Sequence, residues 1–200
     1  MISFFVVAED WLSIYVIRSI LNTFPNKFTI HREDCKNGFG AIKRDIKKYN
    51  EAAKYMPIFA LTDLDNDFCP SRKITDWLDN TTPSEKMFFR IAVKEIESWL
   101  LADREGFAGF LNISQSNIGN TPDQLADPKN ELFRLVKKSR QRRIREAILP
   151  ANGSDMGPAY NSTLQSFVET KWDLTRAQIN SPSLQRTIHA LHSFHERNNS

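Results

Sequence analysis

The chain has 200 residues, of which 40% are hydrophobic and 26% are charged, and its formal net charge is +3. This length and composition fit one ordinary domain or a domain with a helical extension, and they exclude a fibrous or wholly disordered chain. The longest apolar runs, residues 2–8 and 56–61, are far shorter than the roughly 20 residues that cross a bilayer. The first apolar run follows no basic leader, so we expect a cytoplasmic protein that is not embedded in a membrane.

Short β-like runs alternate with helical patterns over the first hundred residues, which is typical of parallel α/β units. We expect strands at 2–8, 27–31, 57–62 and 86–93, and helices at 11–24, 41–54, 71–78, 94–102 and 104–111. From residue 112 onward, helical patterns are separated by turn-rich stretches and no strand is expected. The sequence therefore predicts an α/β domain at 1–111, with a parallel sheet flanked by helices, and a helical extension packed on it at 112–200.

Acidic residues follow three of the predicted strands. They are Glu9 after the first, Asp63, Asp65 and Asp67 after the third, and Glu95 and Glu97 after the fourth. In an open parallel sheet, ligands bind beyond the carboxyl ends of the strands, near the point where strand order reverses. Alternate residues of an extended segment point to the same side, so Asp63 and Asp65 can address one cation together. Oxygen ligands without histidine suit Mg²⁺ or Mn²⁺.

Each of these acids also has an ordinary structural interpretation. Aspartate after a strand is a common helix cap or turn residue, which applies to Asp10 and to Asp67 in particular. Glu95 and Glu97 lie two positions apart, and residues two apart on a helix point in different directions. At least one of these glutamates is therefore structural unless the helix begins later than expected.

The order of these residues resembles the Toprim (topoisomerase-primase) fold. In that fold a glutamate follows the first strand and an Asp-x-Asp follows the third, as Glu9 and the pair Asp63 and Asp65 do here. The chain is most similar to small Toprim-like proteins and to the nuclease part of overcoming-lysogenization-defect proteins. The segments 90–103 and 127–129 also resemble the small group. The chain departs from the family in one place, because Asp10 follows Glu9 where Toprim proteins usually have glycine.

The resemblance implies a Toprim-like α/β fold and a divalent-metal-dependent endonuclease that hydrolyses DNA or RNA with two Mg²⁺ or Mn²⁺ ions. Carried over to this chain, it implies catalytic roles for Glu9, Asp63, Asp65, Glu95, Glu97 and Lys129, with Lys94 as another candidate for a catalytic lysine. The implied metal ligands are Glu9, Asp63, Asp65, Asp67 and Glu97.

The resemblance also implies a partner, an ABC-type ATPase with which the chain would form a hetero-oligomer in bacterial antiviral defence. The sequence contains no Gly-x-x-x-x-Gly-Lys-Ser/Thr motif, so ATP hydrolysis would come from another chain.

Seven positive side chains are concentrated between residues 134 and 145. This charge could follow a nucleic-acid backbone and release counterions, although a solvated helix surface explains it equally well. Arg186 lies at a predicted helix start, where it could face a phosphate or belong to an ordinary cap. The predicted nucleic-acid contacts are Lys137, Lys138, Arg140, Arg142, Arg143 and Arg186.

Two other functions remain open at the level of sequence. A receiver-like phosphoacceptor would also place acids at 9, 10 and 63 and a lysine at 94, but Asp65 and the long helical part argue against it. A Toprim-like scaffold or sensor without catalysis is compatible with the missing glycine after Glu9.

Overall fold

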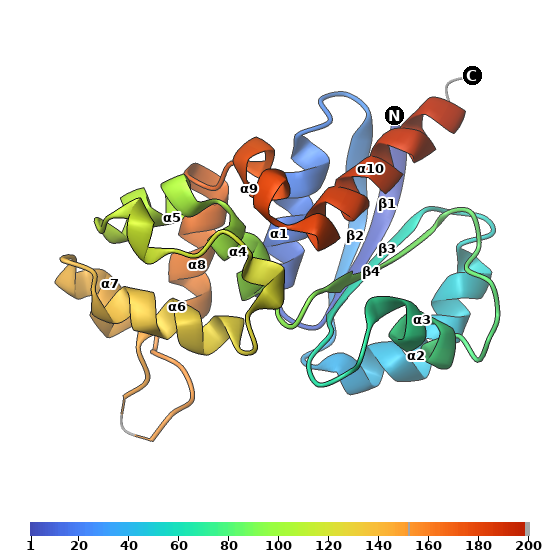
Figure 1. Ribbon diagram of the computed structural model, residues 1–200. Helices are drawn as coiled ribbons and strands as arrows, with labels where there is room; N and C mark the ends of the chain where they lie inside the picture. Colours follow the sequence, from blue (N-terminus) through green and yellow to red (C-terminus); the bar gives the residue numbers. More distant parts are fainter. Residues whose placement is uncertain (152, 199–200) are drawn as a thin grey trace. The chain divides into compact units, whose positions relative to one another are not determined.

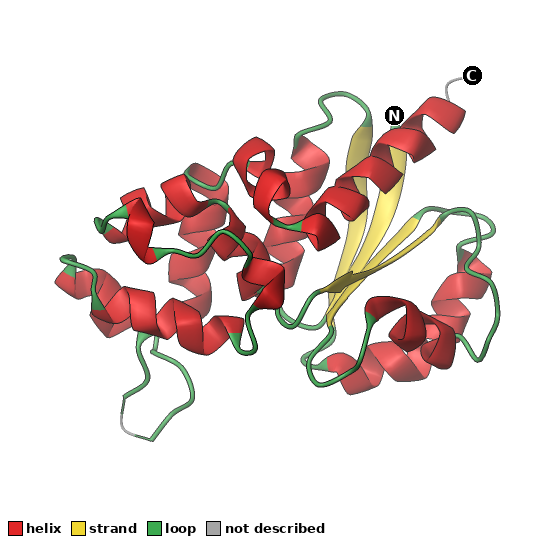
Figure 2. Ribbon diagram, in the orientation of Figure 1, coloured by secondary structure: helices red, strands yellow, loops and turns green. Residues whose placement is uncertain are grey.

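The computed structural model describes residues 1–151 and 153–198 (Figures 1 and 2). The chain forms two compact units. Unit 1 comprises Met1–Val93 together with the C-terminal segment from Thr187, and unit 2 comprises Lys94–Arg186. The division at residues 93 and 94 thus differs from the expected boundary after residue 111, and the end of the chain returns to the first unit.

Unit 1 is an α/β structure whose helices connect parallel strands. Its elements are β1 (Ile2–Ala8), α1 (Trp11–Asn22), β2 (Phe28–Cys35), α2 (Phe39–Ala52), β3 (Ile58–Asp63), α3 (Pro70–Trp77), β4 (Met87–Ala92) and the greater part of α10 (Pro182–Arg197). The predicted α/β class, with a parallel sheet flanked by helices, is confirmed.

The sheet has four strands in the order β2-β1-β3-β4, and all neighbouring pairs are parallel. From β1 the chain moves to one edge of the sheet to form β2, and then crosses to the opposite side of β1 to form β3. Strand order therefore reverses between β1 and β3, and a parallel sheet binds ligands beyond the carboxyl ends of such a pair. Residues 9 and 63 lie at these two ends.

Helices cover both faces of the sheet in unit 1 (Figure 1). On one face, Phe4 and Phe88 stack edge-to-face or at a tilt against Phe194 of α10. On the other face, apolar residues of the strands pack against Ile42 of α2 and Trp77 of α3. Alternating side chains of β1 serve the two faces, which explains why the strands read as nearly continuous apolar runs.

Unit 2 is helical, and none of its described residues belongs to a strand, as the sequence predicts. Its elements are α4 (Glu97–Ala102), α5 (Arg104–Leu111), η1 (Gln115–Asn117), η2 (Pro122–Gln124), α6 (Pro128–Lys137), α7 (Arg142–Ile148), α8 (Tyr160–Thr170), α9 (Leu174–Asn180) and the first turn of α10. Every residue of α4 is buried, so this short helix is the centre of the unit.

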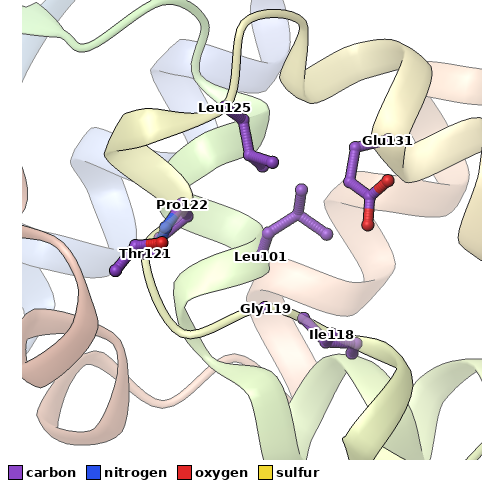
Figure 3. Close-up of a pocket in the computed structure, with 7 residues that line it drawn as sticks. All are labelled: Leu101, Ile118, Gly119, Thr121, Pro122, Leu125 and Glu131. Carbon is purple, nitrogen blue, oxygen red and sulfur yellow. The ribbon is translucent and has the colours of Figure 1, made fainter.

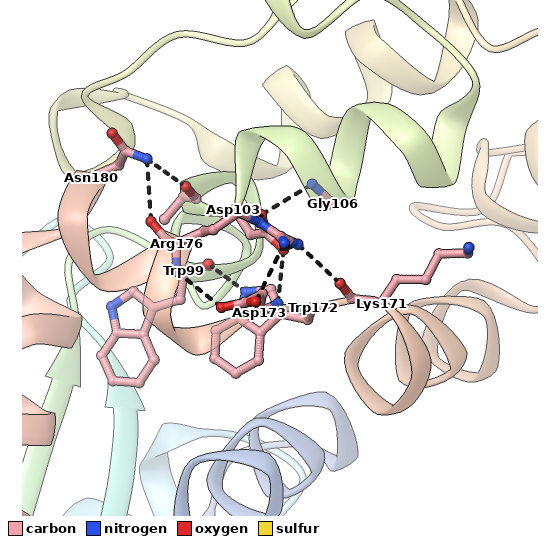
Figure 4. A network of polar contacts seen from close by, with 9 residues as sticks. Trp99, Asp103, Gly106, Lys171, Trp172, Asp173, Arg176 and Asn180 are labelled. Atoms are coloured by element: carbon pink, nitrogen blue, oxygen red, sulfur yellow. Dashed lines mark hydrogen bonds and ion pairs between the residues drawn. The ribbon is translucent and has the colours of Figure 1, made fainter. Parts of the chain in front are cut away.

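An ion pair between Asp103 and Arg176 joins α4, α5 and α9 within unit 2 (Figure 4). The fully buried Asp103 carboxylate accepts hydrogen bonds from Arg176 Nε at 2.7 Å and Nη2 at 2.9 Å, and from the Asp173 amide at 2.8 Å. It also caps α5 by accepting from the Gly106 amide at 3.0 Å. Nearby, Trp172 Nε1 donates to the Trp99 carbonyl at 3.1 Å. These contacts fix the helices that carry the unit's polar side chains.

None of the helices in the described ranges 1–151 and 153–198 combines the length and the apolar character that a membrane crossing requires.

Candidate functional site

The Glu9 carboxylate connects the carboxyl ends of β1 and β3. Its Oε1 accepts a hydrogen bond from the Thr62 hydroxyl and another from the Asp63 amide at 3.0 Å. The Glu9 backbone carbonyl accepts from the Gly38 amide at 3.0 Å, at the start of α2. Asp10, the next residue, is the N-cap of α1 and accepts from the Ser13 amide at 2.7 Å. Glu9 is therefore held at the reversal point of the sheet, while Asp10 has a structural role.

Burial raises the pKa of Glu9 from 4.5 to about 7, and the nearby carboxylates of Asp65 and Asp10 contribute to the rise. The hydrogen bond from the Asp63 amide and the positive charge of Lys73 oppose it. A carboxyl group with this pKa is partly protonated near neutral pH, and a cation beside it would favour the charged form. The charge of Glu9 would therefore depend on whether a cation is bound beside it.

Lys73 of α3 places a buried ammonium group beneath the acidic loop after β3. Its side chain is 2% exposed, and Nζ donates to the carbonyl oxygens of Asp63 at 2.5 Å and Leu64 at 3.4 Å. The same Nζ lies 3.1 Å from Asp67 Oδ2 and 3.8 Å from Asp65 Oδ2. The loop between β3 and α3 is therefore organised around a lysine that belongs to the chain itself.

Local sequence explains how Lys73 reaches this position. Pro70 begins α3, and Cys69 caps it, with Sγ accepting from the Arg72 amide at 3.4 Å. Lys73 and Trp77 are four residues apart and share one helix face, and Nζ lies 4.9 Å from the centre of the Trp77 ring. Asp65 has a φ of +52°, a left-handed conformation that turns the loop back toward α3.

The structure brings Glu9, Asp63, Asp65 and Asp67 of the predicted site to one end of the sheet in unit 1. The Asp65 and Asp67 side chains are about half exposed, at 43% and 52%. Within the part of the chain that the structure describes, no three histidine, cysteine or acidic side chains converge as a metal-binding group. The all-oxygen donor set still fits Mg²⁺, because this ion commonly takes one or two carboxylates and keeps several waters.

Glu95, Glu97 and Lys129 meet in unit 2. Glu95 Oε2 accepts from the Lys129 amide at 2.8 Å, in the first turn of α6. Lys129 Nζ lies 5.4 Å from the centre of the Tyr160 ring, and the Tyr160 hydroxyl donates to Glu97 Oε1 at 2.5 Å. Glu97 is 6% exposed and begins α4, three residues later than the predicted helix start. These predicted catalytic residues therefore form a polar cluster around Tyr160.

The predicted nucleic-acid residues lie on the surface of unit 2. Lys137, Lys138, Arg140 and Arg143 are exposed around the turn between α6 and α7, and among the described residues none has an acidic side chain within ion-pair distance. Arg142, in contrast, pairs with Glu146 at 2.6 Å. The other predicted contact, Arg186, is exposed on α10.

A hollow of about 350 Å³ lies beside this turn. It is lined by Asn112, Ile113, Ser114, Asn117, Lys138 and Arg140. A second cavity, between Leu101, Pro122 and Glu131, has a volume of only about 40 Å³ (Figure 3). The smaller cavity has room for little more than a water molecule, so the larger hollow is the better candidate for an anion.

Three residues that contact the predicted site residues were not predicted from the sequence: Thr62, Lys73 and Tyr160. Thr62 is the last buried residue of β3, and its β-branched side chain resembles any other strand residue. The sequence gives only a weak indication for Lys73: it is a charged residue on a helix face that it shares with the apolar residues Ile74 and Trp77. Tyr160 lies 63 residues from Glu97 along the chain, so no local pattern could connect them.

Comparison with known proteins places the chain in a family. A model of the family described as "Domain of unknown function (DUF4276)" matches residues 9–192. The chain belongs to the DUF4276 family. The DUF4276 match begins at Glu9 and includes the β3–α3 loop, Lys73 and all of unit 2, so both polar clusters lie inside it.

No curated protein matches the chain. One solved structure that is similar is the C-terminal region of the Xanthomonas campestris pv. campestris OLD protein. The sequence identity is 17%, the match covers 82% of this chain and 93% of that chain, and the TM-score is 0.33.

Proposed function

We propose that this DUF4276 protein is a divalent-metal-dependent nuclease whose reaction centre lies beyond β1 and β3 in unit 1. The observation that carries the proposal is the hydrogen bond from the Asp63 amide to Glu9 Oε1, at 3.0 Å. It joins the acids of two strand ends at the place where the sheet reverses its order, with Asp65 following in the same loop. The order of these acids is also the basis of the Toprim resemblance.

In this proposal Glu9, Asp63 and Asp65 hold Mg²⁺ or Mn²⁺ through carboxylate oxygens. When bound, the ion would polarise a phosphodiester and lower the pKa of a bound water. Thr62 and the Asp63 amide orient the Glu9 carboxylate, and Lys73 holds the backbone of the acidic loop. The contacts of Glu95, Glu97 and Lys129 support a structural role in unit 2, and we do not assign them to the reaction centre.

The substrate in this proposal is DNA or RNA, and the exposed basic turn between α6 and α7 is the part of unit 2 that would bind it. Lys137, Lys138, Arg140 and Arg143 carry positive charge that acidic side chains of the described residues do not neutralise. Such charge attracts a phosphate backbone independently of base sequence. An ABC-type ATPase as partner, in a hetero-oligomer that acts in antiviral defence, remains part of the proposal because of the Toprim resemblance.

The proposal is tested by nicking of supercoiled plasmid with the purified protein in Mg²⁺ or Mn²⁺, alone and with a candidate ABC-type ATPase partner. We expect Glu9→Gln and Asp63→Asn each to lower the cleavage rate by at least a hundredfold. Asp45→Asn is the matched control, because Asp45 pairs with Arg44 and Lys48 on the surface of α2 in the same unit. Cleavage that persists in Glu9→Gln and Asp63→Asn would show that the reaction centre lies elsewhere or in a contaminant.

A catalytically inactive scaffold or sensor is the second candidate. It is favoured by one observation, the contact of Lys73 with both Asp65 and Asp67, because one of these two negative charges is then already compensated within the chain. This candidate predicts a folded protein that binds its ATPase partner and cleaves nothing in either metal. The plasmid assay with the partner present therefore separates the two functions.

A further inference from the structure

We propose that the Lys73 ammonium takes the place of a second divalent ion, so that the acidic end of the sheet binds one metal ion and not two. This inference rests on the proposed function, since it concerns the metal ions of that site. It differs from the two-ion arrangement that the Toprim resemblance implies. Its basis is the position of Nζ among four oxygen atoms of the β3–α3 loop.

The surroundings of Nζ are those of a bound cation. Two backbone carbonyls, of Asp63 and Leu64, approach it at 2.5 and 3.4 Å, and carboxylate oxygens of Asp67 and Asp65 lie at 3.1 and 3.8 Å. Carbonyl and carboxylate oxygens of one loop are also the ligands that hard divalent ions take from proteins. The ammonium group therefore occupies the side of the loop on which Asp65 and Asp67 could share an ion.

The Lys73 side chain also has little room to move away when a metal ion binds. Its side chain is 2% exposed, and the aromatic rings of Phe39 and Trp77 lie 5.8 and 4.9 Å from Nζ. The two carbonyl contacts are made to backbone atoms at the end of β3, which the sheet holds in position. A divalent ion bound by Asp67 would lie within a few ångströms of a fixed positive charge, and like charges at that separation in a partly buried site repel strongly.

The remaining acids suffice for one ion. Glu9 follows β1 and Asp63 ends β3, and the Asp63 amide donates a hydrogen bond of 3.0 Å to Glu9 Oε1. No group of three convergent acidic, histidine or cysteine side chains occurs in the described residues, which agrees with an ion held by few protein ligands and several waters. Asp67 is then a partner of Lys73 and not a metal ligand, in contrast to the prediction from sequence.

The test counts bound Mn²⁺ by electron paramagnetic resonance of the free ion, with isothermal titration calorimetry as a second method. The full-length protein is compared with Lys73→Met, which removes the charge and keeps the length of the side chain. Lys47→Met is the matched control, because Lys47 pairs with Asp79 at 2.7 Å on the exposed surface of unit 1. We expect Lys73→Met to bind one ion more than the parent and Lys47→Met to bind the same number as the parent.

Equal ion counts and affinities in the parent and in Lys73→Met would overturn the inference. If Lys73→Met fails to fold, the ion count of the Asp67→Asn variant is an independent test. We expect this variant to keep the ion count of the parent, and the loss of one ion would overturn the inference. A parent that binds one ion and cleaves neither DNA nor RNA would refute the proposed function and leave the inference about Lys73 standing, whereas a parent that binds no ion would overturn both.

Discussion

The Tyr160 hydroxyl donates a hydrogen bond of 2.5 Å to the buried carboxylate of Glu97, between α8 and the start of α4. A buried carboxylate that loses a donor retains its desolvation cost, so Tyr160→Phe should be destabilising. We expect a loss of about 1–3 kcal/mol in the free energy of unfolding, measured by urea denaturation followed by circular dichroism. Tyr55→Phe is the control, because Tyr55 is 84% exposed, and equal stability of the two variants would contradict the importance of this contact.

The raised pKa of Glu9 predicts a pH-dependent stability in the metal-free protein. Between the unfolded value of 4.5 and the folded value of about 7, the folded state binds more protons, so stability falls as pH rises through this window and then levels off. Glu9→Gln removes this effect and should therefore be more stable than the parent by about 1–3 kcal/mol at pH 8, a range reduced because Glu9 is partly exposed. The two proteins should be about equally stable at pH 4.

This prediction is measured by thermal or urea unfolding in EDTA at pH values from 4 to 8. A stability difference between the parent and Glu9→Gln that does not change with pH would show that the pKa of Glu9 is not raised. Added Mn²⁺ should stabilise the parent more than Glu9→Gln, because a cation favours the charged carboxylate.

The Asp103 carboxylate is fully buried in unit 2 and pairs with Arg176, whose side chain is 36% exposed. Asp103→Ala leaves the Arg176 guanidinium without this partner and removes the cap of α5. Breaking a fully buried pair costs about 3–5 kcal/mol, and the partial exposure of Arg176 places the loss of this pair below that range, whereas an exposed pair contributes about 0–1 kcal/mol. We therefore expect Asp103→Ala to lower the melting temperature far more than Glu146→Ala, which breaks the exposed pair with Arg142. A similar small effect of both variants would contradict this account.

The basic turn between α6 and α7 predicts a salt-dependent affinity for nucleic acid. Lys138→Ala with Arg140→Ala should weaken binding of a labelled DNA duplex, and it should reduce the slope of log affinity against log salt by about 2. Fluorescence anisotropy at several salt concentrations measures both quantities. The control with the same change of charge is Lys48→Ala on α2 with Lys54→Ala just after α2, where each lysine already pairs with an acid. Equal slopes for the two double variants would exclude the turn as the binding surface.

The sequence predicted the sheet and the acids at its carboxyl end because both follow from local pattern. The strand β1 is a short apolar run, Glu9 follows it directly, and the acids after β3 begin at the final residue of that strand. The expected strand at 27–31 is longer, since β2 continues to Cys35 through polar residues that pair with β1 at the edge of the sheet. Edge strands tolerate polar residues, so apolar periodicity alone underestimates their length.

The partners of the acids could not be predicted in the same way. Lys73 and Asp63 are ten residues apart on different elements, and their contact depends on how α3 packs against the sheet. The division into units depends on a contact of still longer range, because the segment after Thr187 joins residues at the beginning of the chain. Long-range packing of this kind leaves no periodic signal in the sequence.

The packing of Phe194 on Phe4 and Phe88 has a consequence for the synthesis of the protein. Because β1 precedes α10 by most of the length of the chain, this aromatic face of the sheet lacks the cover of α10 while the residues between them are translated. Uncovered apolar strands of a nascent chain attract chaperones and other unfolded chains. Unit 1 can complete its core only after α10 has left the ribosome.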